Sequence, residues 1–105
     1  FDADEFRNVS AAMVTFQPGA RSAWHTHPTG QTLVVVSGTG WTQIDGAEKQ
    51  VIVAGDVLWC PPNVRHWHGG TATNAMSHIA VTGVNDDGKA VDWLEHVTDE
   101  QYTGE

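Results

Sequence analysis

Histidine is the residue type that gives this chain its clearest chemical potential. Six of the 105 residues are histidine, and five of these lie between residues 25 and 78. They include two pairs with i, i+2 spacing, His25 with His27 and His66 with His68. Side chains alternate between the two faces of a strand, so both members of each pair would point the same way. Imidazoles from two strands can converge on one cation, and they suit zinc, copper, iron and nickel, or manganese when oxygen ligands complete the shell. The spacing therefore predicts a metal site.

Two other side chains, Gln31 and His78, are expected to lie close to this site. Gln31 follows the first pair after a Pro-Thr-Gly turn, which can bring its amide back over the two histidines. His78 shares one face of its segment with Ala80 and Thr82, a small and polar set that suits a cavity wall. His96 has no such neighbours, and we expect it to be structural or exposed.

Short strands separated by turns must position these residues. Apolar and β-branched runs recur between turn signals that use many of the eleven glycines and four prolines. The expected strands cover residues 11–16, 23–27, 32–37, 40–44, 50–53, 57–60, 65–68 and 76–84. Asp45-Gly46 predicts a hairpin, whereas no window before residue 89 has helical periodicity. Thr98 and Gln101 form a capping-box pattern, which predicts a short C-terminal helix. The pattern favours an all-β double-sheet jelly roll.

Length and charge narrow the class of protein further. A chain of 105 residues is expected to form one domain, residues 1–105, and its start at Phe1 is consistent with a truncated N-terminus. The net charge of −8 argues against a nucleic acid or an anionic membrane as partner. The longest apolar run, residues 33–36, is far below the roughly 20 residues that span a membrane. The single cysteine, Cys60, fits a reducing compartment, so we expect a cytoplasmic protein.

Fixed spacings surround both histidine pairs. Five, one, three and six residues separate Gly19, His25, His27, Gln31 and Gly38. Five, one and two residues separate Gly55, Pro61, Asn63 and His66. These spacings resemble the two conserved motifs of the cupin family, G-x5-H-x-H-x3,4-E-x6-G and G-x5-P-x-G-x2-H-x3-N. The resemblance implies the cupin fold, a double-stranded β-helix or jelly-roll barrel.

The resemblance also implies a ligand set. A divalent metal would be held in the mouth of the barrel by His25, His27, Gln31 and His66. Gln31 stands where the family usually has glutamate, and its amide neutralises none of the charge of the ion. The site should then be a stronger Lewis acid and should disfavour the higher oxidation states of oxygen-activating iron. Asn63 replaces a motif glycine, a mild change because asparagine tolerates positive φ, and Gly70 replaces the final asparagine.

His68 and His78 are the candidates for catalysis. His68 shares the face of His66 and should also look into the barrel. Imidazoles that lie near a cation without binding it should have depressed pKa values, because like charge disfavours protonation. They would be neutral bases at pH 7, as proton abstraction requires.

Longer segments carry a closer resemblance. The runs GARSAWHTHP (19–28), HWHG (66–69), AMSH (75–78) and GKAVDW (88–93) look like those of small bacterial cupins that act as manganese-dependent hydroxynitrile lyases. The resemblance implies His78 as catalytic base, with His68 lining the pocket. The expected activity is cleavage or formation of aromatic cyanohydrins. The alternatives are a dioxygenase or oxidoreductase with iron or nickel, which Gln31 disfavours, and a non-catalytic cupin that binds a metal or small molecule.

The expected cofactor and partners follow from this resemblance. Manganese is the first choice of metal, and iron, nickel, cobalt or zinc would also fit. The partner is a small-molecule substrate, and a homodimer or homotetramer is expected. Trp24 and Trp67 alternate with the histidines, so we expect them to pack between sheets or subunits. Cys60 is expected to be a small buried apolar residue.

Overall fold

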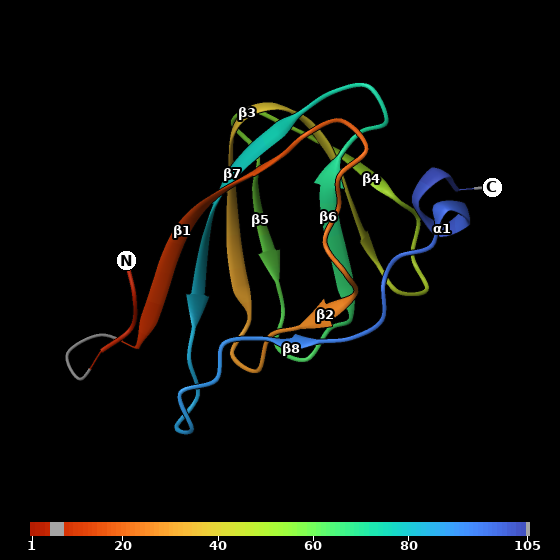
Figure 1. Cartoon of the computed structure of the whole chain (residues 1–105). Helices are drawn as coiled ribbons and strands as arrows, with labels where there is room; N and C mark the ends of the chain where they lie inside the picture. Colours follow the sequence, from red (N-terminus) through yellow and green to blue (C-terminus); the bar gives the residue numbers. More distant parts are fainter. Residues whose placement is uncertain (5–7, 105) are drawn as a thin grey trace.

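The strands of this chain form one curled antiparallel sheet, with a short helix at its side (Figure 1). The computed structural model describes residues 1–4 and 8–104. In the described residues the elements are β1 (Val9–Phe16), β2 (His25–Thr26), β3 (Gln31–Ile44), β4 (Gln50–Val53), β5 (Val57–Cys60), β6 (His66–Gly70), β7 (Met76–Gly83), β8 (Asp92–Trp93) and α1 (Asp99–Thr103). The strand order is β1-β7-β3-β6-β2-β8, and β4 and β5 also pair with β3. The all-β prediction is confirmed.

The long strand β3 joins the two walls of the curled sheet. We expected separate strands over residues 32–37 and 40–44, and this expectation was wrong. The chain instead continues through an irregularity in register between Val35 and Ser37. The first half of β3 pairs with β5 and β7, and the second half pairs with β4 and β6. Gly38 permits the bend, because its φ is 77° and a Cβ would lie 2.0 Å from the Ala75 carbonyl oxygen.

Most other local expectations are confirmed. The hairpin at Asp45-Gly46 connects β3 to β4, and Asn63 has a φ of 62°, as its place in the motif indicates. In α1, the Thr98 hydroxyl accepts a hydrogen bond from the backbone N–H of Gln101, and the Gln101 side chain accepts one from the Thr98 N–H. The two-residue strand β8 was missed, because so short a strand has no periodicity.

Two apolar layers support the sheet. Within the curl, Leu33, Val35 and Met76 are almost completely buried. Cys60 is buried beside Leu33, as expected, and burial raises the pKa of its thiol to about 11.

The second apolar layer lies beneath the C-terminal segment. Trp24 and Trp67 pack against Val97 and Tyr102, which differs from the expected packing between sheets or subunits. The Tyr102 hydroxyl donates a 2.7 Å hydrogen bond to the Gly70 carbonyl. These contacts hold the C-terminal segment in place, so that β8 runs beside β2 (Figure 1). No helix of the described residues is long and apolar enough to cross a membrane.

Candidate metal centre

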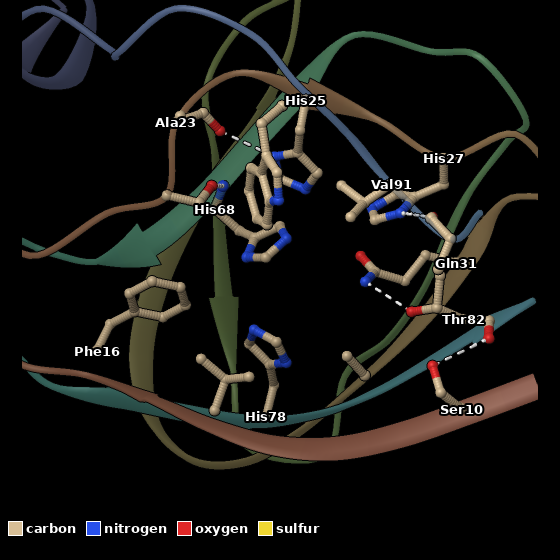
Figure 2. A pocket seen from close by; sticks show the side chains of 15 residues that line it. Ser10, Phe16, Ala23, His25, His27, Gln31, His68, His78, Thr82 and Val91 are labelled. Carbon is tan, nitrogen blue, oxygen red and sulfur yellow. Dashed lines mark hydrogen bonds between the residues drawn. The ribbon is translucent and has the colours of Figure 1, made fainter. Parts of the chain in front are cut away.

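Five histidines and one glutamine meet at one end of the curled sheet, and Figure 2 shows four of these histidines, His25, His27, His68 and His78, with Gln31. The structure brings together all the site residues expected from the sequence: His25, His27, Gln31, His66, His68 and His78. His25 on β2 lies directly opposite His66 on β6, and their ring centroids are 4.3 Å apart. His27 completes the group, and its ring centroid lies 4.9 Å from that of His25 and 5.2 Å from that of His66. All six side chains are buried, so each polar atom needs a partner.

Three of the histidines are oriented by backbone carbonyl groups. The Nδ1 atoms of His25, His27 and His66 lie 2.8, 2.9 and 2.9 Å from the carbonyl oxygens of Ala23, Ala90 and Val64. A carbonyl oxygen only accepts hydrogen bonds, so each Nδ1 carries the proton and each Nε2 keeps its lone pair. Histidines that bind a metal have their second nitrogen hydrogen-bonded in this manner. The Nε2 atoms of His27 and His66 are buried without a hydrogen-bond partner.

Gln31 adds an oxygen to these nitrogens. Its Nε2 donates a 3.0 Å hydrogen bond to the Thr82 hydroxyl. Its Oε1 is buried without a hydrogen-bond partner and faces the interior of the site (Figure 2). Buried acceptors that lack donors are costly unless a cation or a donor is bound. The donor set therefore fits a divalent metal.

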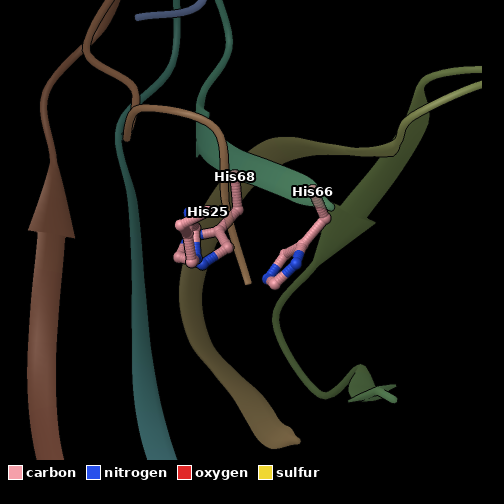
Figure 3. Close-up of side chains that lie close together, drawn as sticks. All are labelled: His25, His66 and His68. Atoms are coloured by element: carbon pink, nitrogen blue, oxygen red, sulfur yellow. The ribbon is translucent and has the colours of Figure 1, made fainter. Parts of the chain in front are cut away.

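His68 and His78 differ from these three histidines. Neither ring nitrogen of either residue has a hydrogen-bond partner, and the two rings lie 4.9 Å apart at 86°. His68 also lies close to the metal-ligand candidates, because one nitrogen from each of His25, His66 and His68 lies within 4.8 Å of the others (Figure 3). The geometry therefore offers His68 either as a base or as a ligand of the same ion.

Burial makes this site a cluster of neutral imidazoles. It is the largest cause that lowers the pKa of all five histidines. The pKa of His25 falls to about 3, with smaller contributions from the neighbouring charges of His66 and His27. For His27, the Ala90 carbonyl and the Gln31 amide oppose the effect of burial. The ligand candidates therefore offer lone pairs, and none of them brings a negative charge.

A cavity of about 530 Å³ opens onto the site. Its polar wall includes His78 and Thr82 beside Ala80, as the alternation along β7 predicted. Its apolar wall includes Val14, Phe16, Val91 and Trp93. The alternation along β1 could have indicated Val14 and Phe16, whereas Val91 lies in the loop before β8 and Trp93 lies in β8, where no periodicity indicates a cavity wall. His96 is exposed and does not line this cavity, as expected.

Comparison with known proteins agrees with this geometry. Residues 12–82 match the cupin domain family. The chain is 56% identical over 102 residues to a curated protein of Granulicella tundricola named (R)-mandelonitrile lyase, and the alignment covers 97% of this chain and 77% of that protein. A cupin-like protein from Thermotoga maritima has a TM-score of 0.87 at 39% identity, over 92% of this chain and 72% of that one. A double-stranded β-helix protein from Klebsiella pneumoniae, at 21% identity and a TM-score of 0.71 over 84% of this chain and 76% of that one, supports the fold alone.

Proposed function

The chain belongs to the cupin family, and from that premise we propose that it is a metal-dependent lyase that cleaves or forms cyanohydrins. The observation that carries the proposal is one buried site that holds both a neutral metal-ligand set and two unpartnered imidazoles. The relative named (R)-mandelonitrile lyase, at 56% identity, supports the same class of reaction.

The metal ligands in this proposal are His25, His27, His66 and Gln31. When bound, a divalent metal would act as a Lewis acid on the oxygen of the substrate. Because the four ligands are neutral, they leave the formal charge of the ion intact. We propose manganese as the metal, supported by the amide oxygen among the ligands; iron, nickel, cobalt and zinc also suit imidazole-rich sites.

His78 and His68 are proposed to move the proton. Burial keeps the pKa of both imidazoles below its ordinary value, so each is a neutral base at pH 7. In the cleavage direction, one ring nitrogen takes the hydroxyl proton of the cyanohydrin. The carbonyl double bond forms as the bond to the nitrile carbon breaks, and its electron pair leaves with cyanide. The protonated imidazole then gives its proton to cyanide, and the products are an aldehyde and HCN.

The apolar wall of the cavity supports an aromatic substrate. Phe16 and Trp93 line the same space as the histidines, and the Trp93 ring lies 5.0 Å from that of His25. Aromatic rings at such distances contribute favourable contacts beyond the area they bury. Mandelonitrile, which carries a phenyl ring on its reacting carbon, is therefore the probe of choice.

The test is metal analysis of the purified protein together with a mandelonitrile cleavage assay. Apoprotein is reloaded with each divalent metal in turn. We expect about one metal per chain, as the single ligand set implies, and release of benzaldehyde restored by Mn²⁺. Stoichiometric metal without cleavage under any ion would refute the lyase and favour an oxygen-using or non-catalytic cupin. Absence of metal binding would refute the site itself.

The ligand assignment is tested separately with two single variants. His27→Ala should lose metal, whereas His68→Ala should retain it. The reverse result would assign the metal ligands as His25, His66 and His68, whose nitrogens also lie close together.

We also propose that the protein is a homodimer or homotetramer. A row of apolar side chains crosses four strands on one face of the sheet, at Met13, Ile79, Val34 and Val57, which are cross-strand partners in that order. Met13 and Val57 are 64% and 67% exposed. Ile79 and Val34 between them are partly buried, and a contiguous apolar patch of this kind is typical of an association surface. Light scattering should give at least a dimer, and Met13→Glu should produce monomers; a monomeric wild type would refute the proposal.

A further inference from the structure

We propose that Thr82 is a positioning residue that holds the Gln31 amide with its oxygen towards the metal site. The inference rests on the proposed role of Gln31 as a ligand. It adds a residue to the machinery of the site that neither the motif spacing nor the ligand set identifies.

The sheet places Thr82 and Gln31 together. Gln31 is the first residue of β3, and Thr82 lies directly opposite it on the antiparallel strand β7. Cross-strand partners have their side chains on the same face, which here is the face of the cavity. Both side chains are buried, at 6% and 7% exposure. The hydrogen bond from Gln31 Nε2 to Thr82 Oγ1 is 3.0 Å long and is also buried (Figure 2).

The orientation of the amide matters because its two ends have opposite chemistry. The oxygen can bind a cation, whereas the NH₂ group only donates hydrogen bonds. If the amide turned over, its NH₂ group would face the histidines, and the free lone pair on Nε2 of His27 would accept a hydrogen bond from it. That arrangement gives the NH₂ group another acceptor, and it removes both the oxygen and a nitrogen from the metal. Competition between the two orientations is therefore built into the site.

Thr82 supplies the acceptor that the ligand orientation needs for its NH₂ group. Its hydroxyl oxygen accepts the hydrogen bond of the NH₂ group when Oε1 faces the site. Without that acceptor, the ligand orientation would bury an amide N–H with no partner, which is costly. Residues that orient a metal ligand typically change metal affinity by about 10–100-fold when they are replaced.

The experiment measures Mn²⁺ binding to apoprotein by calorimetry, without reference to turnover. Thr82→Val keeps the shape of the side chain and removes the hydroxyl group, and we expect its Kd for Mn²⁺ to rise about 10–100-fold. Thr82→Ser keeps the oxygen and should bind as the wild type does. Thr71→Val is the matched control, because Thr71 is equally buried at 6% exposure but its hydroxyl accepts hydrogen bonds within the turn at residues 71–74. Its Kd should not change.

A double-mutant cycle tests whether Thr82 acts through Gln31. In a Gln31→Ala background, Thr82→Val should cause no further loss of affinity, since the group that it orients is gone. Wild-type affinity in Thr82→Val would overturn the proposal. So would equal losses in the valine and serine variants, or an undiminished loss in the Gln31→Ala background. A protein that binds Mn²⁺ but does not cleave mandelonitrile would refute the proposed reaction and leave the role of Thr82 standing, whereas a wild type that binds no Mn²⁺ would overturn both.

Discussion

Gly38 is the position at which we expect one added methyl group to damage the fold most clearly. It lies at the bend of β3, with a φ of 77°. A Cβ added at Gly38 would lie 2.0 Å from the Ala75 carbonyl oxygen and 3.2 Å from the Cα of Met76. The Ala75 oxygen cannot move freely, because it accepts a 3.2 Å hydrogen bond from the Thr39 N–H. Gly38→Ala therefore forces the backbone of two strands apart.

The expected cost has two parts that a second glycine separates. Gly46 has nearly the same backbone conformation, with a φ of 84°, but nothing lies within 4 Å of its substituted Cβ. Gly46→Ala should therefore lower the free energy of unfolding only by the cost of a left-handed conformation, about 1–2 kcal/mol. Gly38→Ala carries that cost together with overpacking, which adds about 1–3 kcal/mol.

Urea unfolding of the metal-free proteins at one pH provides the comparison. We expect both variants to lower the free energy of unfolding, with the larger loss at Gly38. If Gly38→Ala were no more destabilising than Gly46→Ala, then β3 would not be held at Ala75 as described. The explanation of the bend would then be wrong.

Three further predictions concern the site. In the metal-free protein, the histidines bind protons in the unfolded state near pH 6.5, but they stay neutral when they are buried in the folded state. The free energy of unfolding should therefore fall as the pH drops below about 6.5. Because the pKa of His25 in the folded state is about 3, that residue alone implies a loss of roughly 2 kcal/mol between pH 8 and pH 5. A flat urea-unfolding profile over this range would contradict the burial argument. His78→Ala should lower kcat for mandelonitrile about 10²–10⁴-fold at unchanged metal content, and loss of metal would make His78 a ligand. Gln31→Glu should tighten Mn²⁺ binding in calorimetry, because the carboxylate adds a negative charge that four neutral ligands lack; unchanged affinity would exclude Gln31 from the ligand set.

Local sequence patterns were sufficient for the elements and for the candidates of the site. The i, i+2 spacing of the histidines depends only on the alternation of side chains along a strand. The hairpin at Asp45-Gly46 and the cap at Thr98 depend on residues within one turn of each other. For the same reason, the face of β7 that carries His78 and Thr82 could be assigned to the cavity from the sequence alone.

The tertiary structure decided what lies opposite each of these residues. The carbonyl group that orients His27 belongs to Ala90, and the hydroxyl group that orients Gln31 belongs to Thr82. These contacts join residues far apart in the chain, and alternation tells which face a side chain occupies but not which strand will be its neighbour. The bend of β3 was misjudged for the same reason, because the glycines at residues 38 and 40 look like a turn until Ala75 is seen packed against the first of them. The residue types needed for a metal site are therefore set by the sequence, and pairing between distant strands decides their protonation, orientation and reach.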